Sequence, residues 1–129
     1  MKNYLIVVTG MLAIFLTACG GDVGQIQIPD QHWKDMAVRI DTHPNPPIAG
    51  MSEIVAIVTG PHGRPISNLT VSWRSNESMP WVQAIQDGRI GVYRRAVDLG
   101  GGDVVVLQVR LQQGEEQKVL LFPLKLTKD

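Results

Sequence analysis

This sequence of 129 residues contains a single cysteine and no excess charge of either sign. One cysteine excludes an intramolecular disulfide and any zinc site built from several thiolates. Twelve Lys and Arg residues balance twelve Asp and Glu residues, whereas a nucleic-acid-binding domain normally carries a basic excess or a basic stripe. We therefore expect no nucleic-acid partner.

The longest hydrophobic run lies at the N-terminus and is short. After Lys2, the apolar segment 4–16 leads into the tetrapeptide Leu16-Thr17-Ala18-Cys19. A membrane span needs about 20 apolar residues, so this length is typical of the central region of a signal peptide. The tetrapeptide resembles the lipobox of bacterial lipoproteins, which implies cleavage before Cys19 and attachment of diacylglycerol to its thiol. The alternative is an uncleaved N-terminal anchor followed by a free thiol.

This interpretation divides the chain into three parts. Residues 1–18 are the expected signal peptide, residues 19–35 the lipidated cysteine with a flexible tether, and residues 36–129 the folded domain. The expected location is the bacterial cell envelope, with the lipid bilayer as one partner through acylated Cys19. Gly20, rather than an aspartate, follows the cysteine, which by the same resemblance implies the outer membrane, facing the periplasm, if the host has two membranes.

The rest of the sequence lacks any long segment with apolar residues at helical spacing. The segment Asp30–Met36 is compatible with one helical turn capped by Asp30, and short β-prone runs follow. Apolar and polar residues alternate over Leu69–Arg74 and over Asp103–Gln112, and Asp87-Gly88 is a strong hairpin signal. The sequence therefore predicts one antiparallel immunoglobulin-like β-sandwich of six to seven strands.

The same patterns predict which side chains face the core. The continuous apolar run Glu53–Thr59 is suited to a strand buried on both sides, and Met79–Ile85, which carries Pro80, is at most a weak or edge strand. Trp73 and Tyr93 are expected in the core and Trp81 near an edge. The remaining core positions form alternating sets: Val38 and Ile40; Leu69 and Val71; Val105, Leu107, Val109 and Leu111; Leu120, Phe122, Leu124 and Leu126.

A set of turn and core positions resembles a known family. The set consists of Pro47 with Gly50, Gly63 with Pro65 and Ile66, Leu69–Val71, Met79-Pro80, and Gly91 with Tyr93. In this order the residues resemble the YtkA-like and FixH-like group of small immunoglobulin-like domains in exported bacterial proteins, over about residues 37–126. Some members of that group are linked to copper handling or to the assembly of respiratory metalloenzymes. The sequence departs from the family pattern at Asp103, where the family often has a tryptophan.

Candidate metal ligands are few and scattered. Thioether and imidazole groups suit copper, and the candidates are His43, Met51, Met79 and His32. Antiparallel strands place His43 beside Met51 and His62 at the opposite end of the sandwich. The alternative is that the methionines fill gaps in the core and the histidines lie on the surface. We expect no resident cofactor, with copper as the one candidate.

No catalytic residues are predicted. The serines near residues 67–78 have no histidine close in sequence, and the triple glycine at 100–102 lacks the lysine and helix of a phosphate-binding loop. The predicted function is therefore a non-catalytic, envelope-facing binding or assembly module with a protein partner of the cell envelope, whose free strand edges offer one way to bind it. The alternative is a periplasmic carrier of copper or a small ligand.

The lipobox makes a direct prediction about the mature N-terminus. Mass spectrometry of the protein isolated from bacterial membranes is expected to find acylated Cys19 as the first residue. The variant Cys19→Ser removes the acceptor thiol, so the acyl mass is expected to disappear and the precursor to remain uncleaved. Membrane-bound wild-type protein that still begins at Met1 would contradict the prediction.

Overall fold

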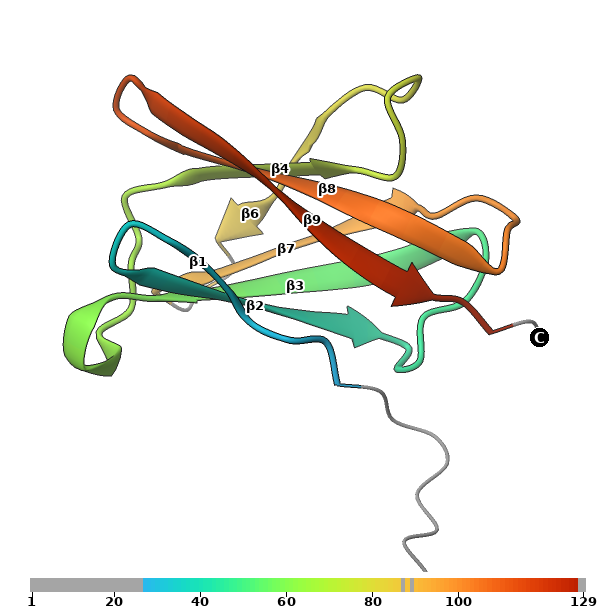
Figure 1. Cartoon of the computed structure of the whole chain (residues 1–129), viewed down its shortest axis with the longest axis horizontal. Helices are drawn as coiled ribbons and strands as arrows, with labels where there is room; N and C mark the ends of the chain where they lie inside the picture. The colour runs from blue at the N-terminus through green and yellow to red at the C-terminus, as the bar shows by residue number, and fades with distance from the viewer. Residues whose placement is uncertain (1–26, 87, 89, 128–129) are drawn as a thin grey trace, which may run out of the picture.

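The computed structural model describes residues 27–86, 88 and 90–127, so the predicted signal peptide and Cys19 lie outside the described residues. The described chain is all-β, with two antiparallel sheets of five and four strands that face each other (Figure 1). This arrangement confirms the predicted all-β class and is consistent with a β-sandwich. The number of strands was predicted wrongly, because the described residues form nine strands rather than six or seven.

The two sheets divide the chain as follows. The five-stranded sheet has the spatial order β1 (Gln31–Trp33), β2 (Met36–His43), β3 (Met51–Thr59), β7 (Val92–Asp98), β6 (Ile85–Gln86). The four-stranded sheet has the order β5 (Val82–Gln83), β4 (Thr70–Arg74), β8 (Val104–Gln113), β9 (Glu116–Lys125). A three-residue 3-10 turn, η1 (Pro61–Gly63), follows β3.

The core lies between the sheets and is formed by the side chains that the alternation predicted. From Leu107 to Leu111 in β8 and from Leu120 to Leu124 in β9, every second residue is buried, and Leu107 lies opposite Phe122 in the pairing of the two strands. Removing a large apolar side chain from water contributes about 1.5–3 kcal/mol. The largest buried side chains come from both sheets: Trp73, Tyr93, Phe122, Met36, Ile40, Ile54, Leu107, Leu111 and Leu124.

The first additional strand replaces the predicted helical turn over Asp30–Met36. Trp33 pairs with Met36, so β1 and β2 form a tight hairpin in which Lys34 has a φ of 55°. Lys34 lies over the Trp33 ring at 4.7 Å and forms a 2.6 Å ion pair with Glu116 of β9. The ion pair comes from a residue distant in sequence, and together with the pairing of β1 and β2 it outweighs the weak local preference for a turn of helix. The sheet therefore begins at Gln31, ahead of the predicted domain boundary at residue 36.

The second additional strand arises because the predicted weak strand Met79–Ile85 changes sheets. β5 pairs with β4, whereas β6 pairs with β7 of the other sheet. Between them, Ala84 is buried and its N–H donates to the Val71 carbonyl at 2.8 Å. β6 and β7 pair as neighbouring antiparallel strands, and their last pair is Gln86 with Tyr93, so the connection between them is longer than a two-residue turn. Asp87 of the predicted Asp87-Gly88 turn lies outside the described residues.

Several of the residues that carry the family resemblance meet at one place and have a structural role there. The Tyr93 hydroxyl donates a hydrogen bond to the Ile66 carbonyl at 2.9 Å. Gly91, with a φ of 78°, lies so close to the same segment that a Cβ atom there would be 2.7 Å from Pro65 Cβ and 3.0 Å from the Val58 carbonyl oxygen. These residues fix the connection from β3 to β4 against β7.

This close approach predicts a large effect of Gly91→Ala on stability. The left-handed backbone costs about 1–2 kcal/mol for any residue with a Cβ, and the forced displacement of Pro65 adds about 1–3 kcal/mol. Gly114→Ala is the matched control, because Gly114 also has a positive φ, of 60°, but a Cβ atom there would meet nothing within 4 Å. Urea denaturation of residues 20–129 measures both. Equal losses in the two variants would contradict the packing role of Gly91.

Tyr93 makes a second prediction, for alkaline pH. Burial raises the pKa of its phenol above the ordinary value of 10.0, and a hydrogen bond with the Leu69 backbone lowers it in part. Stability from this group is therefore complete below pH 10.0 and is lost as the pH rises through the higher pKa of the folded state. Tyr4 is the only other tyrosine, so phenolate absorbance of residues 20–129 reports Tyr93 alone. We expect ionisation above the ordinary pKa; ionisation at the ordinary value in the folded protein would contradict this.

Candidate functional site

Two of the predicted metal ligands lie close together at one end of the sandwich. His43 is the last residue of β2 and Met51 the first of β3, and His43 pairs with Glu53 across the two strands. Both side chains are exposed, Met51 to 60%. Met51 therefore does not fill a gap in the core, as the alternative interpretation expected.

The other two predicted ligands do not join them as a set. Met79 lies in the loop after β4, at the same end but on the four-stranded sheet, and is half-buried. His32 lies on β1 opposite Ala37, and Ala37 pairs on its other side with Thr59 at the end of β3. His32 is therefore at the end of the sandwich opposite to His43, the same end as His62. Across residues 27–86, 88 and 90–127, no three His, Cys, Asp or Glu side chains come together as a metal site.

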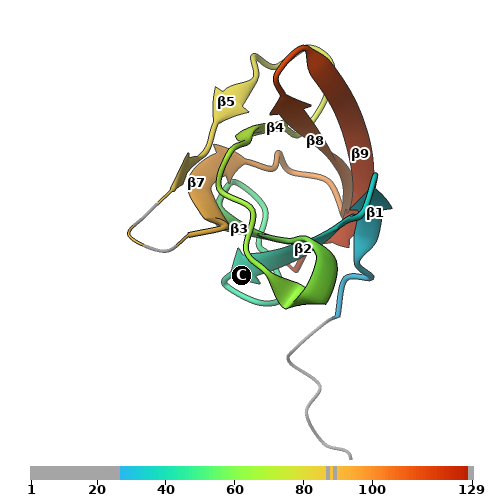
Figure 2. The ribbon, with the colours of Figure 1, turned by 90° about the vertical axis from the view of Figure 1, so that its left-hand side faces the viewer.

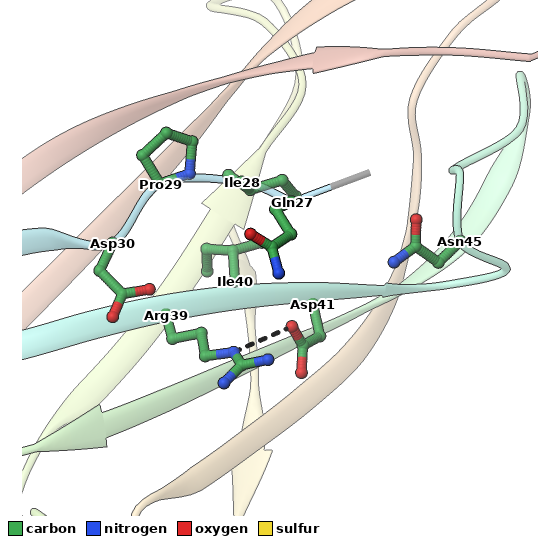
Figure 3. A pocket seen from close by; sticks show the side chains of 8 residues that line it. All are labelled: Gln27, Ile28, Pro29, Asp30, Arg39, Ile40, Asp41 and Asn45. Atoms are coloured by element: carbon green, nitrogen blue, oxygen red, sulfur yellow. Dashed lines mark hydrogen bonds and ion pairs between the residues drawn. The ribbon is translucent and has the colours of Figure 1, made fainter. Parts of the chain in front are cut away.

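A hollow of about 590 Å³ lies beside the segment that leads into β1 (Figure 3). Asp30 lines it from that segment, and Arg39 and Asp41 line it from the outer face of β2. The Arg39 guanidinium points at Asp41, and the Nε–Oδ1 distance is 3.3 Å. The guanidinium is thus already paired with a carboxylate, and the lining offers no convergent charge for an ionic ligand.

The outer face of the five-stranded sheet is covered by charges of both signs. Besides the Arg39–Asp41 pair, Arg94 of β7 lies 4.0 Å from Glu53 of β3. Val55, between these strands, is buried beneath the long side chains, because their methylene stems cover apolar surface while the charged groups stay in water. This face has the mixed charge of an ordinary solvated surface.

The outer face of the four-stranded sheet is different. Val104 and Val106 of β8 and Val119 and Leu121 of β9 point outward and are 62%, 43%, 38% and 53% exposed. Seven large apolar side chains are exposed among the described residues, and four of the seven belong to this one strand pair. We call these four residues the apolar patch. Concentrated exposed apolar surface marks an interaction site far more often than scattered residues do.

A basic cluster adjoins the apolar patch on the same face. The guanidinium carbons of Arg74 on β4 and Arg110 on β8 lie 4.3 Å and 4.5 Å from the centre of the Trp81 ring. Arg74 Nε also donates to Gln108 Oε1 at 2.9 Å. We call Arg74, Trp81 and Arg110 the basic cluster. The indole holds both guanidinium groups through cation–π contacts, each worth about 0.5–1 kcal/mol at an exposed site.

The free edges of both sheets are poor sites for strand addition. β1, β5 and β6 have two or three residues each. The long edge strand β9 carries Pro123, which has no N–H to offer, and the side chain of Gln31 donates to the Leu121 carbonyl. Prolines and short strands are common means of protecting an edge from pairing. The edge pairing that the sequence suggested is thus disfavoured relative to binding on the face.

The sequence contained a signal for the apolar patch that the prediction did not use. The outward positions of a half-exposed strand are normally polar, and Gln108, Arg110 and Gln112 satisfy this rule. Val104 and Val106 break it in the same strand. The approach of Arg74 and Trp81 to Arg110 had no local signal, because it depends on the pairing of β4 with β8.

Comparison of the chain with protein-family models, with curated proteins and with solved structures found no match. The lipobox and the resemblance to the YtkA-like group therefore stay predictions from the sequence. Among the described residues, no helix has the length and hydrophobicity needed to cross a bilayer.

Proposed function

We propose that this protein is a lipid-anchored binding or assembly module of the bacterial cell envelope, without catalytic activity of its own. Its domain would be an immunoglobulin-like sandwich of the YtkA-like and FixH-like kind, tethered to the membrane through acylated Cys19. Its partner would be another protein of the envelope.

The observation that carries this proposal is the apolar patch. Val106 and Leu121 have outward positions that the alternation of β8 and β9 fixes, since their neighbours Leu107 and Phe122 are fully buried. Val106 and Leu121 are therefore true surface residues and not core residues exposed by poor packing. An exposed apolar area next to arginine and tryptophan has the composition of a protein–protein interface, in which aromatic residues and Arg are enriched.

The proposal predicts that Leu121→Asp strongly weakens partner binding without unfolding the domain. A carboxylate in the patch would have to be desolvated on binding, which is expected to reduce recovery of the partner about tenfold or more. Ile85→Asp is the matched control, because Ile85 is 59% exposed, similar to Leu121, but lies on the other sheet.

Crosslinking in intact envelopes, followed by purification and quantitative mass spectrometry, measures this recovery. The partner is expected with the wild type and with Ile85→Asp, and not with Leu121→Asp. Equal recovery with both variants would contradict the use of this face.

A further inference from the structure

The outer face of the four-stranded sheet is positively charged as well as apolar. Over strands β4, β5, β8 and β9, all of which the structure describes, the outward positions carry Arg74, Arg110 and Lys125 and no carboxylate. The chain as a whole has no net charge, and the opposite sheet pairs its outward arginines with acids. The charge of this face is therefore a local feature and not a consequence of composition.

The basic cluster keeps two like charges close together. Arg110 lies opposite Ser72, and Arg74 lies opposite Gln108, so the two arginines are diagonal neighbours on adjacent strands. Like charges at such positions repel each other. The Trp81 ring offsets this repulsion, because both guanidinium groups contact the same indole. Two oriented guanidinium groups present planar donor arrays that match carboxylates.

We propose that this face binds an acidic segment of the partner protein, in which Asp or Glu side chains alternate with or adjoin apolar ones. The inference rests on the proposed function and names the chemistry of the partner. The carboxylates would bind Arg74 and Arg110, and the apolar side chains would cover Val106 and Leu121. Charge complementarity of this kind directs the choice of partner and speeds association.

A second copy of the chain is a poorer occupant of the same face. If two copies met through this face, Arg74 and Arg110 of one would approach the same residues of the other, because a two-fold interface places like patches together. No acid on the outward positions of the four strands would compensate the repulsion.

An anionic membrane is also a poorer occupant. Figures 1 and 2 both show that residues 27–30 leave the domain on the side of the five-stranded sheet, away from the outer face of the four-stranded sheet. The predicted anchor, Cys19, precedes Gln27 by eight residues, a span of at most about 28 Å when extended. An anchor on that side favours an orientation in which the outer face of the four-stranded sheet points away from the membrane, toward the aqueous space.

The test uses the full acylated chain in neutral detergent micelles and a fluorescent random copolymer of glutamate and tyrosine as the probe. Fluorescence anisotropy gives the affinity. We expect Arg74→Gln/Arg110→Gln to weaken binding about tenfold. We expect the control pair Arg39→Gln/Arg64→Gln, with the same change in charge, to leave it within about twofold. Wild-type binding is expected to weaken as salt rises from about 0.05 M to about 0.5 M.

Equal weakening in the two double variants, or no binding of the copolymer, would overturn the inference. Displacement of the copolymer by glycerol phosphate at the same concentration of charge would also overturn it, in favour of a lipid headgroup. Dimerisation of the wild type that depends on Arg74 would overturn it in favour of a second copy. Unchanged far-UV circular dichroism confirms that the variants are folded. If the double variant unfolds, the single variants Arg74→Gln and Arg110→Gln are measured instead. The inference is overturned if neither of them weakens binding of the copolymer.

Partner recovery from envelopes separates this inference from the function on which it rests. If Leu121→Asp loses the partner but Arg74→Gln/Arg110→Gln keeps it, the acidic segment is wrong and the binding module stands. If neither variant loses the partner, the proposed function falls with the inference. If both lose it, the crosslinked partner segment is expected to contain Asp or Glu beside apolar residues, and a segment without acids would overturn the inference.

Discussion

The alternation of buried and outward side chains in the middle of β8 and β9 is the constraint on which the rest of the structure depends. Leu107 and Phe122 pair across the two strands and are completely buried. A slip of one residue in either strand would move its whole buried set into water, so the register is fixed by a large free-energy difference. The identity of every outward side chain is fixed with it. This is why the apolar patch and the basic cluster share one face.

Protection of the sheet edges follows from the same arrangement. A ten-residue strand such as β9 at the edge of a sheet offers unpaired backbone groups to other chains. Pro123 removes one donor, Gln31 occupies the Leu121 carbonyl, and the β1–β2 hairpin is held there by the ion pair of Lys34 with Glu116. With the edges blocked or short, the largest group of exposed apolar side chains lies on a face of a sheet, where a partner could be bound without a change in the backbone pairing.

Much of the fold was predictable because it depends on local periodicity. The inward residues of β4, β8 and β9 follow directly from alternation, and so do the core positions of Trp73 and Tyr93. The β1–β2 hairpin was not predictable, since Lys34 adopts a positive φ through contacts with Trp33 and Glu116. The basic cluster was not predictable either, because its members come together only through strand pairing. The four candidate metal ligands looked similar in sequence, yet antiparallel pairing divides them between the two ends.

The central claim is that the outer face of β8 and β9 is covered by a partner in the native envelope. Cysteine accessibility tests it directly, since the predicted acylation of Cys19 leaves no other reactive thiol. With a membrane-impermeant maleimide in opened envelopes, we predict that Leu121→Cys reacts at least about tenfold more slowly than in the purified protein, whereas Ile85→Cys reacts at the same rate in both. Equal reactivity of Leu121→Cys in envelopes and in the purified protein would contradict the claim.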